Sequence, residues 1–146
     1  SYFKVLDSYF SLTLVYVAFN LPFAIWMMRG YIEEIPAALE ESALVDGCTR
    51  WQVLLYVVVP MARSGLAATT VFTFIFSWNE FMFALVLAGR EVVTYPVRLS
   101  GYFSNVQALW NMAGAMSIIA TIPIFIVVVF FQRYLVRGLS MGAIKG

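Results

Sequence analysis

The chain has 146 residues, of which 62% are hydrophobic and 12% are charged, and its mean hydropathy is +0.87. A soluble domain is about half apolar and a quarter charged, so this composition predicts a membrane protein. The net charge of +1 argues against a nucleic-acid partner, and the absence of histidine with a single cysteine excludes an internal disulfide and a His/Cys metal site.

Three apolar runs have about the 20 residues that a helix needs to cross a bilayer. These runs, residues 9–28, 65–88 and 112–131, predict an all-α membrane protein with three transmembrane helices. Of the nine Lys and Arg residues, six fall in the first connection and the tail, and three fall on the other side. The positive-inside rule therefore predicts a cytoplasmic loop 29–64, an external loop 89–111 and a cytoplasmic tail 132–146.

The predicted cytoplasmic loop contains signals for two short helices and a tight bend. Pro36 suits the first turn of one helix, and Gly47 suits the left-handed position that closes it. Thr49 and Gln52 have the spacing of a capping box, so a second helix should begin there and end before Pro60. The result would be a knob that fits a socket on another protein; a surface amphipathic loop is the alternative.

The second predicted span carries a polar stripe at helical spacing. Its members are Thr69, Thr73, Ser77 and Glu80, with Asn79 beside them. A carboxylate at membrane depth usually faces a bundle interior or a wet cavity, so these residues are candidates for a transport path or gate. Alternatively, the hydroxyls bond to their own helix and Glu80 pairs with a neighbouring helix.

Glycines recur every four residues in the predicted cytoplasmic tail. This spacing would let a neighbouring backbone approach closely if the tail is helical. We therefore expect a subunit or ATPase interface there, with the candidate residues Arg137, Gly138, Gly142 and Lys145.

The predicted knob resembles the EAA motif of ABC-importer permeases. Glu41-Ser42-Ala43 is followed at the family's spacing by Gly47 and then by Val57-x-Val59-Pro60. Ser42 replaces the first alanine of the motif, and valines replace its isoleucine and leucine. Residues 18–36, 76–87 and 136–146 look like the maltose-type, carbohydrate branch of these permeases. Members of the family usually have about six spans, and this chain looks like the last three.

The resemblance implies a subunit of a sugar importer in the bacterial or archaeal inner membrane. Its implied partners are ABC ATPase subunits, a second permease subunit, an extracytoplasmic solute-binding protein, the sugar and membrane lipid. The chain has no Gly-x-x-x-x-Gly-Lys-Ser/Thr sequence, so ATP and Mg should be bound by the partner ATPase and no catalytic residue is expected here. The implied ATPase-coupling residues are Glu40, Glu41, Ser42, Ala43, Asp46, Gly47 and Pro60.

Two other functions are compatible with the sequence. An importer permease for glycerol phosphate or a polyol is one, because solute recognition would depend on the other spans of the permease and on the binding protein. A small homo-oligomeric channel would explain the polar stripe that ends at Glu80, but it would not explain the knob. A membrane enzyme is the weakest alternative, because one buried carboxylate without His or a second acid offers little catalytic apparatus.

Overall fold

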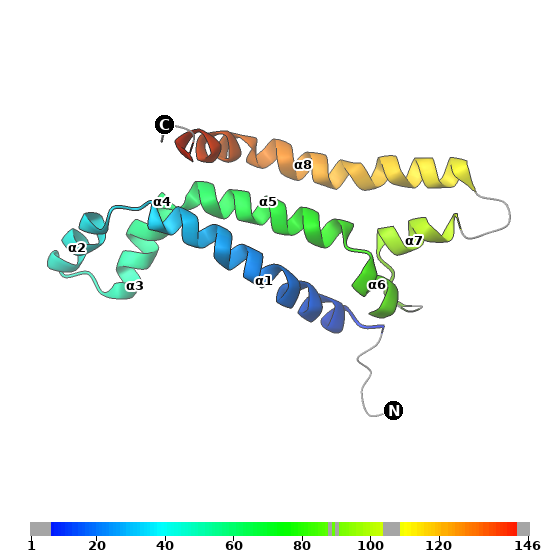
Figure 1. Ribbon diagram of the computed structural model, residues 1–146, viewed down its shortest axis with the longest axis horizontal. Helices are drawn as coiled ribbons and strands as arrows, with labels where there is room; N and C mark the ends of the chain where they lie inside the picture. The colour runs from blue at the N-terminus through cyan, green and yellow to red at the C-terminus, as the bar shows by residue number, and fades with distance from the viewer. Residues whose placement is uncertain (1–6, 88, 90, 104–108, 143–146) are drawn as a thin grey trace, which may run out of the picture. The chain divides into compact units, whose positions relative to one another are not determined.

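In the computed structural model, residues 7–87, 89, 91–103 and 109–142 are described, with side chains as far as Tyr134. Every regular element in this part of the chain is helical, which confirms the predicted all-α class (Figure 1). In chain order the elements are α1 (Tyr9–Glu33), α2 (Ala37–Val45), α3 (Arg50–Val53), the π-helix η1 (Leu54–Val58), α4 (Val59–Met61), α5 (Arg63–Asn79), α6 (Met82–Leu87), α7 (Tyr95–Gly101) and α8 (Trp110–Gly142).

The helices belong to two compact units. Unit 1 contains the residues up to Leu21 together with Phe74–Val129, and unit 2 contains Pro22–Thr73 and the residues from Phe130 onward. The two units share the helices α1, α5 and α8, because the boundaries fall inside each of these helices. The candidate polar residues from Ser77 onward lie in unit 1, whereas the predicted knob lies in unit 2.

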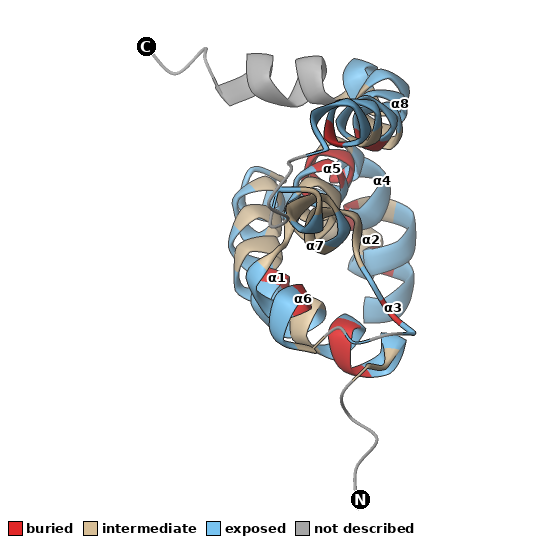
Figure 2. Cartoon of the chain, turned by 90° about the vertical axis from the view of Figure 1, so that its right-hand side faces the viewer, coloured by how far each residue is buried: buried red, intermediate tan, exposed pale blue. Residues whose placement is uncertain are grey.

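Among the described residues, two helices are long and apolar enough to cross a membrane. They cover Tyr9–Glu33 and Trp110–Tyr134, with mean hydropathies of 1.6 and 2.5. The first and third predicted spans are thus confirmed as helices, and both helices continue beyond the predicted bounds. Only 17% and 6% of their most apolar windows are buried, and Figure 2 shows α1 and α8 mostly in the colour of exposed residues. Such apolar surfaces suit contact with lipid or with other membrane helices.

The second predicted span is not one continuous helix. α5 ends at Asn79 and α6 begins at Met82, so Glu80 and Phe81 form a break inside the predicted range 65–88. A third span is possible only when Arg50–Met61 and Arg63–Asn79 are counted together, and these two segments are bent by 73°. Hydropathy identified an apolar stretch here but could not locate the break, because the break depends on side-chain hydrogen bonds to the backbone.

The prediction that the second knob helix ends before Pro60 is wrong. The helix passes through the π-helix η1 and then through α4, which contains Pro60. Pro60 has no N–H to donate, and the preceding π-turn changes the backbone pairing just where an α-helix would need that N–H. The helical path ends two residues after Pro60, at Ala62, where the 73° bend lies.

Unit 2 is held together by close contact between the second half of α1 and the first half of α5. Gly65 is buried against Tyr31, and an added Cβ at Gly65 would overlap the Tyr31 side chain. The Phe23 and Phe72 rings also meet edge to face, with centroids 6.1 Å apart. Glycine at position 65 therefore permits the approach of the two helices to which the knob is attached.

Unit 1 has a small apolar core around α6. Leu12 of α1, Ala84 of α6 and Val92 are buried together, and Ala84 is fully enclosed. The Phe19 and Phe83 rings add an edge-to-face contact between α1 and α6, with centroids 5.6 Å apart. This core fixes a six-residue helix that would be too short to persist alone in water.

Candidate functional site

The knob consists of residues 37–53, in which α2 and α3 are joined by a bend at Gly47. Gly47 has φ +88°, the left-handed conformation that the sequence predicted. The Gly47 N–H donates to the Leu44 carbonyl at 3.1 Å, and the Cys48 N–H donates to the Ala43 carbonyl at 3.0 Å. These two bonds form a Schellman motif, which satisfies the last carbonyls of α2 and turns the chain sharply.

The second helix of the knob begins with the predicted capping box. The Thr49 backbone N–H donates to Gln52 Oε1 at 2.7 Å, and the Gln52 N–H donates to Thr49 Oγ1 at 3.4 Å. Each side chain thereby satisfies a backbone donor that the start of a helix leaves unpaired. The bend is thus defined on both sides by hydrogen bonds within the knob itself.

The tip of the knob exposes apolar and acidic groups next to each other. Val45 is 87% exposed and Trp51 is 73% exposed, and Glu41 and Asp46 are also exposed. Large apolar side chains with this much exposure beside charged groups are typical of a surface that contacts another protein.

Glu40 differs from the other acidic residues of the knob because it is half-buried. It lines a cavity of about 220 Å³, together with Leu44, Arg50 and Val53 of the knob and with Leu54 and Val58 of η1. The predicted coupling residues Ser42 and Ala43 lie on α2, and the Ser42 hydroxyl donates to the Leu39 carbonyl at 3.0 Å. The structure therefore brings together all predicted coupling residues except Pro60, which lies in α4.

The polar stripe of the second span is divided between two kinds of contact. Thr69 and Thr73 lie on α5; Thr73 Oγ1 donates to the Thr69 carbonyl at 2.8 Å, and the buried Thr69 hydroxyl has no hydrogen-bond partner in the structure. Ser77, one turn further along α5, accepts a hydrogen bond from Asn20 Nδ2 at 3.1 Å. That these residues line a transport path stays a prediction.

Glu80 lies outside α5, so it does not belong to the helical stripe that the spacing predicted. Its carboxylate accepts hydrogen bonds from the Phe83 N–H at 2.8 Å and the Ala84 N–H at 3.0 Å. Glu80 therefore caps the N-terminus of α6, where a negative charge is favoured by the helix dipole. This cap is the physical reason for the break between α5 and α6.

Asn79 connects the end of α5 to α7. The Tyr95 hydroxyl donates to Asn79 Oδ1 at 2.8 Å, and Asn79 Nδ2 donates to the Ile75 carbonyl at 2.9 Å. Asn79 and Glu80 are therefore neighbours in sequence with different contacts. Asn79 is hydrogen-bonded to α7, and Glu80 caps α6.

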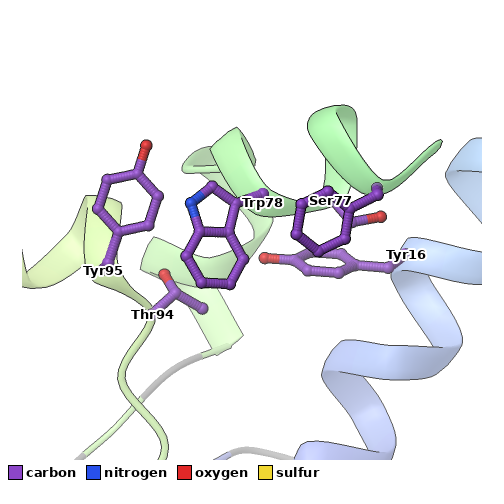
Figure 3. Close-up of a pocket in the computed structure, with 6 residues that line it drawn as sticks. Tyr16, Ser77, Trp78, Thr94 and Tyr95 are labelled. Carbon is purple, nitrogen blue, oxygen red and sulfur yellow. The ribbon is translucent and has the colours of Figure 1, made fainter. Parts of the chain in front are cut away.

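An aromatic cavity of about 310 Å³ lies next to this connection. Its lining residues are Tyr16, Phe74, Ser77, Trp78, Thr94 and Tyr95. Figure 3 shows the Trp78 indole between Tyr95 and Tyr16, with the Tyr16 hydroxyl pointing toward the indole. Trp78 Nε1 donates to the Ala120 carbonyl of α8 at 3.1 Å, so the indole also joins α5 to α8 within unit 1.

Two lining residues of this cavity carry buried polar atoms without hydrogen-bond partners, namely Tyr16 Oη and Thr94 Oγ1. A third such atom, Oδ1 of Asn20, belongs to the side chain that donates to the lining residue Ser77. A buried polar atom without a partner costs free energy, so water or a polar ligand would be stabilised beside it. Sequence reasoning missed Asn20, although a lone amide in an otherwise apolar span is a signal that could have identified it.

The predicted tail interface falls mostly outside the described side chains. Arg137, Gly138 and Gly142 lie in the backbone of α8, which is helical to Gly142, and Lys145 lies outside the described residues. The predicted helical spacing of the glycines is therefore present up to Gly142. That this face forms an interface stays a prediction.

The comparison with known families identifies the class of protein. Residues 3–141 match the family described as "Binding-protein-dependent transport system inner membrane component". Because the match covers most of the chain, the protein belongs to this family, and it is a multi-pass component of the inner membrane. This result confirms the resemblance to ABC-importer permeases that the EAA-like motif indicated.

Several curated relatives are similar over almost the whole chain. The probable ABC transporter permease protein y4oR of Sinorhizobium fredii is 41% identical over 96% of this chain and 50% of its own length. The diacetylchitobiose uptake system permease protein DasC of Streptomyces coelicolor is 41% identical over 98% of the chain and 52% of its own length. The trehalose/maltose transport system permease protein MalG of Thermococcus litoralis is 36% identical over 96% of this chain and 51% of its own length. The chain thus spans about half the length of these relatives.

Proposed function

We propose that this chain is part of the permease subunit of an ATP-driven importer that moves a sugar or oligosaccharide into the cell. The knob carries the proposal. Gly47 lies at an exposed tip, in a backbone conformation that other residues adopt at a cost, between a Schellman motif and a capping box. A connector without a partner would have no need of this self-contained bend, whereas a contact that transmits movement needs a tip of defined shape.

The chemistry of the tip supports a protein partner. Val45 and Trp51 offer apolar area to a cleft, and Glu41 and Asp46 offer charge to basic groups at its rim. The partner is the ABC ATPase subunit, which binds and hydrolyses ATP with Mg, while this chain transmits the movement. A second permease subunit and a solute-binding protein complete the transporter.

The names of the relatives support a carbohydrate as the solute. Two of the relatives described above are named as permeases for diacetylchitobiose and for trehalose/maltose. A third relative, a trehalose transport permease of Mycobacterium tuberculosis, is 38% identical over 96% of the chain. These solutes differ in size and linkage, so they support a class rather than one sugar. Family membership favours an importer over a homo-oligomeric channel.

The experiment compares Gly47→Leu with the control Gly30→Leu in the full transporter. Gly30 is exposed in α1, and an added Cβ there meets no atom within 4 Å, so the control adds the same apolar side chain without straining a left-handed residue. At Gly47 the strain is about 1 kcal/mol, and the side chain also enlarges the tip. Gly47→Leu should reduce copurification of the ATPase, or leave ATP hydrolysis running without sugar uptake.

A third variant, Gly47→Asn, separates the two causes. Asparagine tolerates the left-handed conformation, so this change enlarges the tip with little strain. If both Gly47 variants lose coupling, the tip fills a cleft; if only Gly47→Leu does, the shape of the bend is what matters. Wild-type copurification and uptake in both variants would contradict the coupling role.

A further inference from the structure

The carboxylate of Asp7 is surrounded by backbone amides from a segment more than 80 positions away. Asp7 Oδ1 accepts hydrogen bonds from the Gly89 N–H at 3.0 Å and the Val92 N–H at 2.8 Å. The Glu91 N–H donates to Asp7 Oδ2 at 3.0 Å and to Oδ1 at 3.1 Å. Hydrogen bonds to an ionised acceptor are stronger than neutral ones, so this arrangement favours the charged carboxylate.

The backbone of Asp7 takes part in the same contact. Its N–H donates to the carbonyl of Leu87, the last residue of α6, at 2.8 Å. Asp7 has φ +59°, and it is the one residue other than glycine with positive φ in the part of the chain that the structure describes. Aspartate is among the few residues that accept this conformation. Both the side chain and the main chain of Asp7 therefore serve to hold the end of α6.

Three sets of hydrogen bonds therefore hold described residues between Glu80 and Tyr95. Glu80 caps the start of α6, Asp7 holds the segment after its end, and the Tyr95 hydroxyl bonds to Asn79. Thr94 and Tyr95, which are separated from the Asp7-bound Val92 by one residue, form one wall of the aromatic cavity (Figure 3). Release of Gly89, Glu91 and Val92 would therefore loosen that wall, whereas the opposite wall belongs to α1 and α5.

We propose that Asp7 is a positioning residue that keeps one wall of the aromatic cavity of unit 1 in place by holding Gly89, Glu91 and Val92. Asp7 does not line the cavity; it acts through Thr94 and Tyr95. The expected effect of Asp7 on uptake rests on the proposed importer function, because a solute moves past the cavity only if the protein is a transporter. The structural part of the proposal, that loss of Asp7 loosens the wall formed by Thr94 and Tyr95, is independent of the solute.

Gly89 provides a second way to disturb the same contact. An added Cβ at Gly89 would meet the Cβ, Cγ and Oδ2 atoms of Asp7, so Gly89→Ala should push the carboxylate away from the amides. Gly101, at the end of α7, is the matched control, because an added Cβ there meets no atom within 4 Å. Only glycine at position 7 lacks all three of these atoms, and it also accepts the positive φ of this position, so Gly89→Ala should have little further effect in an Asp7→Gly background.

The test measures access to the cavity in the full transporter, purified without solute and depleted of other reactive cysteines. Thr94→Cys places a thiol where the Thr94 hydroxyl is buried, and a membrane-impermeant maleimide reports its exposure. Asp7→Asn and Gly89→Ala should each raise the labelling rate about tenfold, because opening becomes more frequent when charge-assisted hydrogen bonds are lost. Gly101→Ala should label at the wild-type rate.

Two results would overturn the proposal. One is an unchanged labelling rate in both Asp7→Asn and Gly89→Ala. The other is a Gly89→Ala effect of equal size with Asp7 and with Asp7→Gly, since the collision would then not be the cause. If Asp7→Asn does not assemble, the Gly89→Ala comparison still decides. In uptake assays, Asp7→Asn and Gly89→Ala should each raise the KM for the solute and retain the turnover number. Failure of uptake in the unmodified complex would instead count against the proposed function.

Discussion

The Asn20 side-chain nitrogen donates a hydrogen bond to the Ser77 hydroxyl, 3.1 Å away, and so joins α1 to α5 within unit 1. Asn20 is only 8% exposed, and its Nδ2 also donates to the Tyr16 carbonyl one turn earlier. A polar contact between membrane helices gives them a specific register, which the surrounding apolar contacts do not.

The first prediction concerns the strength of this contact. A double-mutant cycle of Asn20→Ala and Ser77→Ala should give a coupling free energy of about 0.6–1.7 kcal/mol, measured by reversible unfolding in mixed micelles. Ser117 is the control, because its hydroxyl bonds to the Ala113 carbonyl within α8. Asn20→Ala and Ser117→Ala should be additive. If the effects of Asn20→Ala and Ser77→Ala on the free energy of unfolding are also additive, the hydrogen bond contributes nothing to stability.

The second prediction concerns Glu80. Replacement by Leu removes the cap of α6, which should destabilise that helix by about 1 kcal/mol. We expect lower uptake with unchanged ATPase copurification, because Glu80 is in unit 1 and the knob is in unit 2. Glu80→Gln keeps one acceptor oxygen and should be intermediate. Loss of the ATPase from a correctly inserted Glu80→Leu complex would contradict this assignment.

The third prediction concerns the capping box of the knob. Thr49→Ala should destabilise the start of α3 by about 1 kcal/mol, because the Gln52 N–H loses its acceptor. Hydrogen exchange at Gln52 should accelerate about fivefold to tenfold, while Thr49→Ser, which retains a hydroxyl oxygen, should stay near the wild-type rate. Equal protection in the Ala and Ser variants would mean that the cap does not stabilise the bend.

The fourth prediction concerns the C-terminal tail. Deletion of residues 138–146 should weaken assembly with the ATPase or the second permease subunit, because the glycine spacing at 138 and 142 permits close backbone approach along α8. Copurification and uptake are the measurements. Replacing the same residues with a flexible Gly/Ser segment controls for length. Normal assembly and uptake after the deletion would remove the tail from the interface.

Local sequence patterns predicted the knob well because its determinants are close together in the chain. The Schellman bonds at Gly47 join residues three and five positions apart, and the Thr49 capping box joins residues three positions apart. Such contacts form from local backbone geometry, so they can be read from spacing alone. Hydropathy likewise located α1 and α8, because crossing a bilayer requires a long apolar helix.

The sequence by itself determined the class of protein, the apolar helices and the bend at Gly47. The Glu80 cap of α6 and the π-turn before Pro60 also join residues close in the chain, but hydropathy and helical spacing did not reveal them. Only the tertiary structure decided that Asp7 holds Gly89, Glu91 and Val92, at separations of 82 to 85 positions. The physical reason is that a carboxylate can satisfy any amide that the fold brings within reach, and sequence spacing does not specify which amides those are.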